Sequence, residues 1–119
     1  MDSLKVENFE IKVSKGMDGS VRLQWTGRSE ARNPGDILNP YLDGNIGFLK
    51  GKNIIVDFTK LEFMNSSTVP PIIKFIKNCS VNEIPAVVQF DKNSEWQNAS
   101  FKPLQTVCMV LKNIKVEGV

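Results

Sequence analysis

The chain of 119 residues contains no histidine. Histidine is the commonest general base of enzymes and a frequent ligand of bound metals. Its absence excludes Ser-His and Cys-His catalysis and most zinc sites. We therefore expect a protein that is not an enzyme and that has no catalytic residues, no metal site and no cofactor.

Cysteine is also scarce. The two cysteines, Cys79 and Cys108, stand far apart in the sequence, and both fall at apolar positions of expected helices. This placement is typical of buried thiols, so we interpret both as core residues.

Long runs of basic or apolar residues are missing as well. The 15 Lys and Arg residues and the 13 Asp and Glu residues leave a net charge of +2, and no segment concentrates the basic ones. This balance disfavours a nucleic-acid surface. No stretch reaches the roughly 18 apolar residues of a membrane span, and the start, MDSLKVENFE, has neither a basic flank nor an apolar core. We expect a cytoplasmic protein that binds neither nucleic acid nor membrane.

The hydrophobic pattern predicts alternating strands and helices. Two alternating segments, 9–13 and 21–25, flank the turn residues 16–19 and predict a β-hairpin. Further on we expect a helix that starts at Asn39 and Pro40 and ends before Gly51, a strand at 54–56, a helix at 69–79, a strand at 84–90, a helix at 96–111 interrupted by Pro103, and a strand at 114–116. The β-branched run at 54–56 favours a strand covered on both faces. The order β-β-α-β-α-β-α-β predicts an α/β fold in a single domain, residues 1–119, with helices packed on one mixed sheet that begins with the hairpin.

The segment from Asn53 to Cys79 carries the most information. After residue 68 its apolar positions recur at steps of three and four, as in a helix with one buried face. Pro70 and Pro71 are tolerated only in the first turn, so we predict Thr68 or Ser67 as the N-cap. The hydroxyl cluster, Ser66, Ser67 and Thr68, then lies just beyond a central strand, where ligands and modifications act in open α/β sheets.

The run VDFTKLEFMNSSTVPPII, residues 56–73, resembles the signature of STAS domains, the family of anti-sigma factor antagonists. In that family a strand ending in aspartate leads to an Asp-Ser-Ser-Gly loop and a helix, within the same order of elements. The motif Met-Asn-Ser-Ser-Thr, with Pro-Ile-Ile nearby, is more similar to that of a divergent bacterial subgroup of the family. The chain departs from the family pattern at Asn65, where aspartate is usual, and at Thr68 and Pro70, where glycines are usual.

The resemblance implies a bacterial signalling module that binds a partner protein. In the family a cognate kinase phosphorylates the second serine of the loop, and Ser67 matches that position. The implied partners are an anti-sigma-like serine kinase and a phosphatase. The other residues that we expect in the loop or against the partner are Asp57, Asn65, Ser66, Thr68, Lys74 and Lys77.

Each of these residues also has a plainer interpretation. The three hydroxyl residues can serve only as loop and helix cap, and Asn65 as a turn former. Asp57 can accept hydrogen bonds from loop amides, and the two lysines can form a solvated helix face.

Two other functions remain open. One is a STAS-like scaffold or small-ligand sensor that is never phosphorylated. The other is a serine enzyme, which would need a Ser-Lys pair, and no Ser-x-x-Lys motif precedes a suitable loop at Ser66 or Ser67. Because Pro70 and Pro71 remove two amides from the first turn of the helix, we also expect the loop to bind free phosphate poorly compared with a glycine-rich loop.

Overall fold

The computed structural model describes all 119 residues as a seven-stranded sheet with helices. The strands are β1 (Leu4–Val6), β2 (Phe9–Lys15), β3 (Val21–Ser29), β4 (Ile54–Asp57), β5 (Leu61–Met64), β6 (Ala86–Phe90) and β7 (Ile114–Gly118). The helices are α1 (Gly35–Gly44), α2 (Ile46–Leu49), the 3-10 helix η1 (Ser66–Thr68), α3 (Val69–Val81) and α4 (Glu95–Cys108). The predicted order of elements is confirmed, and the chain adds two short strands, β1 and β5, that the sequence pattern did not indicate.

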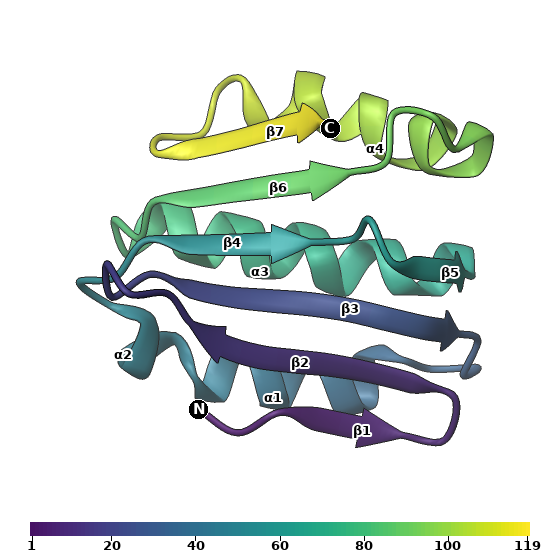
Figure 1. Cartoon of the computed structure of the whole chain (residues 1–119), viewed down its shortest axis with the longest axis horizontal. Coiled ribbons are helices and arrows are strands. Elements are labelled where there is room, and N and C mark those ends of the chain that lie inside the picture. The colour runs from purple at the N-terminus through teal and green to yellow at the C-terminus, as the bar shows by residue number, and fades with distance from the viewer.

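The sheet is mixed, as predicted. Six strands lie in the order β1-β2-β3-β4-β6-β7, and β5 pairs with the end of β3. The first three strands are antiparallel neighbours, whereas β3, β4, β6 and β7 run parallel. The parallel strands therefore end at one edge of the sheet, where the chain continues from β4 through β5 into η1 and α3 (Figure 1).

Helices α1, α3 and α4 pack on one face of the sheet, and the other face is open (Figure 1). Ile54 and Val56 on β4 point to the helices and are buried, whereas Ile55 lies on the open face and is half-buried. The expectation that this strand is covered on both faces is wrong, because no helix crosses the open face.

One cluster of 24 buried apolar residues fills the space between the sheet and the helices. Its centre is a row of aromatic rings, in which Phe58 stacks on Phe101 with 4.6 Å between the centroids. Cys79 and Cys108 belong to this cluster, so their predicted burial is confirmed. Burial raises the pKa of both thiols, that of Cys79 to about 12, which keeps them protonated at neutral pH.

The first helix starts earlier than predicted. We predicted Asn39 and Pro40 as its start, but α1 begins at Gly35 and contains Pro40. Pro40 removes one backbone hydrogen bond from α1 and lies on its exposed side, while two leucines on the other side are buried. The helix also ends sooner, because the chain turns at Asn45 before α2.

Helix α4 runs unbroken past Pro103, contrary to the predicted interruption. Pro103 is exposed, and the buried side of the helix packs against β6 and β7. Gln97 on α4 donates hydrogen bonds to the carbonyl oxygens of Phe58 (2.8 Å) and Leu61 (3.0 Å). These two bonds hold the segment between β4 and β5 against α4.

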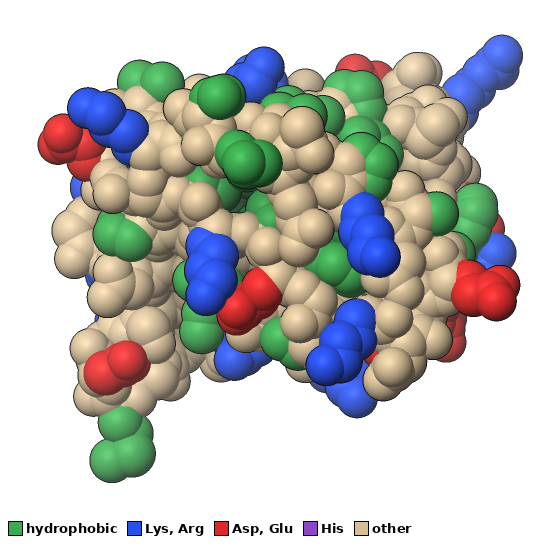
Figure 2. All heavy atoms as spheres, turned by 90° about the horizontal axis from the view of Figure 1, so that it is seen from above, with side chains coloured by type: hydrophobic (Ala, Val, Ile, Leu, Met, Phe, Trp, Pro, Cys, Tyr) green, Lys and Arg blue, Asp and Glu red, His purple; other side chains and the backbone are tan.

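The surface carries charges of both signs. Figure 2 shows the edge of the molecule formed by β7 and α4, where basic and acidic side chains are interspersed with apolar ones and form no continuous patch of one sign. None of the helices is both long and apolar enough to cross a membrane.

Candidate functional site

The loop predicted as the functional site lies at the carboxyl edge of the parallel strands. The chain leaves β5 at Met64, extends through Asn65 and then coils into η1, which continues directly into α3. Thr68 occupies the N-cap position of α3, as one of the two predictions had it, but its side chain makes no capping hydrogen bond. The hydroxyl cluster is therefore a helical turn of its own rather than a simple cap.

Thr68 faces the interior and is fully buried. Its hydroxyl group lies 2.7 Å from the Ser29 hydroxyl on β3 and donates a hydrogen bond of 2.8 Å to the Asn65 side-chain oxygen. Thr68 therefore belongs to the loop, and its buried side chain offers no exposed surface to a partner. It fixes the loop against the end of β3, and Ser29 is a residue that sequence reasoning missed.

Asn65 is held on three sides. Its amide nitrogen donates to the carbonyl oxygen of Ser29 (2.9 Å), and its side-chain NH2 donates to the carbonyl oxygen of Ala31 (2.8 Å). Its side-chain oxygen accepts the bond from Thr68. An ionised aspartate could not donate to Ala31, so the local geometry accounts for asparagine at a position where the STAS pattern has aspartate.

Ser66 and Ser67 are the exposed members of the cluster, and neither hydroxyl group has a hydrogen-bond partner within the chain. Ser67 lies in a polar hollow of about 310 Å³ between the first turns of α1 and α3. The other residues that line this hollow are Asn33, Pro34, Gly35, Asp36, Asn39, Pro70, Pro71 and Lys74. No pattern in the sequence indicates that α1 lies beside α3. The residues that α1 contributes to the hollow could therefore not be predicted.

The two lysines of α3 differ in their surroundings. Lys74 lines the hollow beside Ser67 and forms an exposed ion pair of 3.1 Å with Asp43 on α1. Lys77 is exposed and forms no ion pair. Only Lys74 therefore belongs to the same local site as Ser67.

Asp57 lies apart from the loop. It is buried at the end of β4, where its carboxylate accepts hydrogen bonds from the amide and hydroxyl groups of Thr59 (2.9 and 2.6 Å). Its second oxygen pairs with Arg22 on β3 at 2.8 Å, and Arg22 also reaches Gln89. These contacts agree with the plainer interpretation of Asp57 as a strand-end acceptor, and they do not bring it to Ser67.

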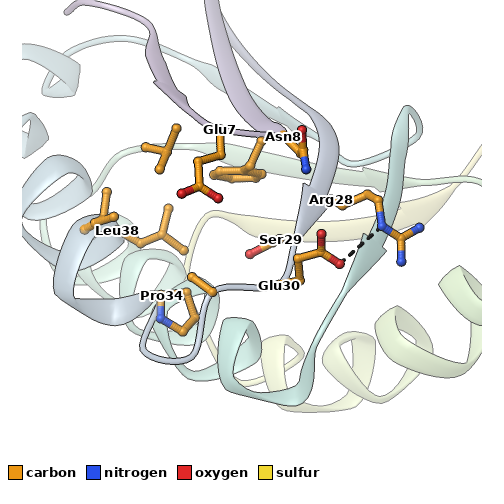
Figure 3. A pocket seen from close by; sticks show the side chains of 11 residues that line it. Glu7, Asn8, Arg28, Ser29, Glu30, Pro34 and Leu38 are labelled. Carbon is orange, nitrogen blue, oxygen red and sulfur yellow. Dashed lines mark hydrogen bonds and ion pairs between the residues drawn. The ribbon is translucent and has the colours of Figure 1, made fainter.

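A second depression of about 280 Å³ opens beside the loop, on the other side of Pro34 (Figure 3). It lies between the β1–β2 turn, the end of β3 and the start of α1, and its walls include Val6, Phe9, Ala31, Pro34, Ile37 and Leu38. The turn can approach β3 because Gly27, at φ +81°, has no Cβ where the Asn8 carbonyl oxygen lies. Sequence reasoning gave no sign of this pocket.

Comparison with known proteins identifies the fold. No protein-family profile matches the sequence, and no curated protein matches it. Among solved structures, the chain matches SiaC in the crystal structure of the diguanylate cyclase SiaD in complex with its activator SiaC from Pseudomonas aeruginosa, with a TM-score of 0.63, 13% identity and coverage of 98% of both chains. It also matches an uncharacterised protein of the DUF3478 family with a SpoIIAA-like fold from Shewanella loihica PV-4, with a TM-score of 0.59, 12% identity and coverage of 98% of this chain and 90% of the other. The STAS-like fold predicted from the sequence is thereby confirmed.

Proposed function

We propose that this chain is a non-enzymatic signalling module of the bacterial cytoplasm, which binds a partner protein and is switched by phosphorylation of Ser67. The expected partner is a serine kinase related to anti-sigma factors, and a phosphatase reverses the modification. The binding surface consists of the exposed part of the loop, Ser66 and Ser67, with the first turns of α3.

The observation that carries this proposal is the contrast between the hydroxyl groups of the loop. A kinase must reach the oxygen that it modifies, and the Thr68 hydroxyl is buried between two partners. Ser67 is exposed, has no partner within the chain and borders an open polar hollow. Its position also matches the phosphorylated serine of the STAS pattern.

The likeness to SiaC supports a role in binding proteins, since the solved complex contains SiaC as the activator of an enzyme. The partner of the present chain can therefore include an effector whose activity depends on docking. The loop nevertheless favours a kinase as the partner. This kinase would bind the module while Ser67 is unphosphorylated.

The alternative is a scaffold or small-ligand sensor that is never phosphorylated. The observation that favours it is that Asn65 and Thr68 are occupied in holding the loop to β3, so the loop has a structural explanation of its own. The state of Ser67 in living cells separates the two candidates.

The decisive experiment is peptide mapping by mass spectrometry on the protein isolated from its native cells. Cleavage after Lys60 and Lys74 yields one peptide that contains Ser66, Ser67 and Thr68 as its only hydroxyl residues. We expect one phosphoryl group, located on Ser67 by fragmentation, in a fraction that changes with growth conditions. Ser67→Ala should lose the modification, whereas the neighbouring Ser66→Ala should keep it. A phosphoryl group on Ser66 or Thr68 would refute the assignment, and an unmodified peptide under all conditions would favour the scaffold.

A further inference from the structure

The pocket beside Pro34 combines apolar walls with an acidic rim. Six of its eleven lining residues are apolar: Val6, Phe9, Ala31, Pro34, Ile37 and Leu38. The polar residues, Glu7, Asn8, Arg28, Ser29 and Glu30, come from the β1–β2 turn and the end of β3. Ile37 is exposed at this site, so apolar surface remains open to solvent.

The rim has a net negative charge. Glu30 pairs with Arg28 at 3.3 Å, and the Arg28 guanidinium also lies 4.8 Å from the centre of the Phe63 ring. Figure 3 shows the Arg28 guanidinium turned away from the pocket and the Glu7 side chain reaching over it. Glu7 forms no ion pair and no side-chain hydrogen bond. One carboxylate at the opening is therefore left without a cation.

Glu7 also has a backbone conformation that does not suit glutamate. Its φ is +50°, in the left-handed region where glycine and asparagine are less strained. A turn of two residues between β1 and β2 could use glycine here at lower cost to the fold. A strained residue at the opening of a pocket is a reason to look for a binding role.

We infer that this pocket receives an apolar side chain of the partner protein, with a lysine or arginine next to it that pairs with Glu7. The volume of about 280 Å³ is large enough to admit an apolar side chain, and the apolar walls suit one. Interfaces are commonly anchored by one side chain in such a pocket. The rim charge then selects the neighbouring residue of the partner.

This inference rests on the proposed partner binding and extends it, because the pocket adjoins the Ser67 loop. The pocket and the polar hollow share Pro34 as a lining residue. Two pocket residues, Ser29 and Ala31, are hydrogen-bonded to Thr68 and Asn65. A partner anchored in the pocket therefore lies within reach of Ser67 without any change of the fold.

The test is an NMR titration of the isotopically labelled full chain with short peptides. Binding is monitored through the backbone amide resonances of the chain. The probe is acetyl-Ala-Leu-Arg-Ala-amide. One control peptide replaces Leu by Gly, and a second replaces Arg by Glu. We expect the probe to shift the amides of residues 7–8, 28–31 and 37–38. The Gly peptide should bind roughly tenfold more weakly or worse, since it lacks the buried anchor. The Glu peptide should bind about two- to fivefold more weakly than the probe, the range of an exposed ion pair.

Three variants locate the binding. Glu7→Gln should cost the Arg peptide about two- to fivefold in affinity and spare the Glu peptide. Ala31→Leu narrows the pocket. It should remove the amide shifts caused by the probe and by the Glu peptide. Glu7→Gly should raise the melting temperature and weaken binding of the probe.

A matched control is available at the other end of the sheet. Glu83, between α3 and β6, is also an exposed glutamate with positive φ, +58°, and does not line the pocket. Glu83→Gly should raise the melting temperature in the same way and leave probe binding unchanged. A probe that leaves the pocket amides unshifted at millimolar concentration, or that binds Ala31→Leu as well as the wild type, overturns the inference.

The pocket and the phosphorylation switch can fail separately. With the partner recovered from native cells, loss of binding in Ser67→Asp but not in Ala31→Leu would overturn the pocket and leave the switch intact. Loss in Ala31→Leu but not in Ser67→Asp would support the pocket and refute the switch.

Discussion

Single residues explain why the loop departs from the STAS pattern. Asn65 needs a donor for the Ala31 carbonyl and an acceptor for the Thr68 hydroxyl, and an asparagine side chain supplies both. Thr68 in turn needs its hydroxyl for Ser29, which a glycine would lack. The two departures therefore belong together, because the Asn65 side-chain oxygen accepts the hydrogen bond that the Thr68 hydroxyl donates.

Asn65→Asp should destabilise the fold at neutral pH. The carboxylate would face the Ala31 carbonyl oxygen with no proton to donate, and the loss of this solvent-exposed hydrogen bond should cost about 0.5–1.5 kcal/mol. A protonated carboxyl can donate, so its pKa is raised in the folded state, and the penalty should shrink as the pH falls through that raised pKa and vanish below about 4. Urea denaturation at pH 7 and pH 3.5, against wild type at the same pH, measures both effects.

The matched control for this variant is Asn33→Asp. Asn33 is exposed beside the same loop, and its side chain makes no hydrogen bond. It adds the same charge without removing a donor, so its effect on the free energy of unfolding should stay within about 0.5 kcal/mol. Equal losses in the two variants would mean that charge, rather than the bond to Ala31, limits the position.

At the scale of elements, the junction of η1 and α3 determines what the loop can bind. Anions bind at helix N-termini through free backbone amides. Pro70 and Pro71 have no N–H, and the Thr68 amide already donates to the Asn65 carbonyl. The first turn of α3 is therefore short of donors compared with a glycine-rich loop.

We predict that the loop binds inorganic phosphate weakly or not at all. Isothermal calorimetry with phosphate up to millimolar concentration should show no saturable heat, and the amide resonances of Thr68 and Val69 should not shift. Pro70→Gly combined with Pro71→Gly restores two amides and serves as the comparison. Tight phosphate binding to the wild-type loop would contradict this account of α3.

For the whole molecule, the sheet and helices form a scaffold with a fixed core, and the proposed site lies on its surface. The apolar cluster that joins α1, α3 and α4 to the sheet contains neither Ser66 nor Ser67. A charge added at Ser67 near the start of a helix is tolerated and contributes at most about 0.3–1 kcal/mol. The switch should therefore act on the partner and leave the fold unchanged.

Ser67→Asp should bind the partner far more weakly while its melting temperature changes by no more than about 4 °C. A charge left unpaired in a contact that excludes water costs about 3–5 kcal/mol, or a hundredfold to several thousandfold in affinity. Calorimetric binding and thermal unfolding of the same preparation give both numbers. Ser14→Asp, on the open face of the sheet at β2, adds the same charge away from the loop and should bind normally. Partner binding of Ser67→Asp at wild-type strength would rule out the switch.

The sequence by itself determined the order of the elements, the helix that follows the loop and the burial of both cysteines. These features depend on periodicity and on the backbone limits of proline, which act over a few neighbouring residues. The same local information located Ser67 at a helix start and supported the STAS-like fold that the comparison with solved structures then confirmed.

Only the tertiary structure decided which residues of the loop face outward and what surrounds them. Thr68 turns inward because Ser29 lies opposite, and Asp57 pairs with Arg22 of β3 rather than with a group of the loop that contains Ser67. Strand β5 forms because β3 is long enough to pair with it, and the pocket needs three segments that are distant in sequence. Such contacts depend on the register of the sheet and on the path of α1, and no local pattern in the sequence encodes either one.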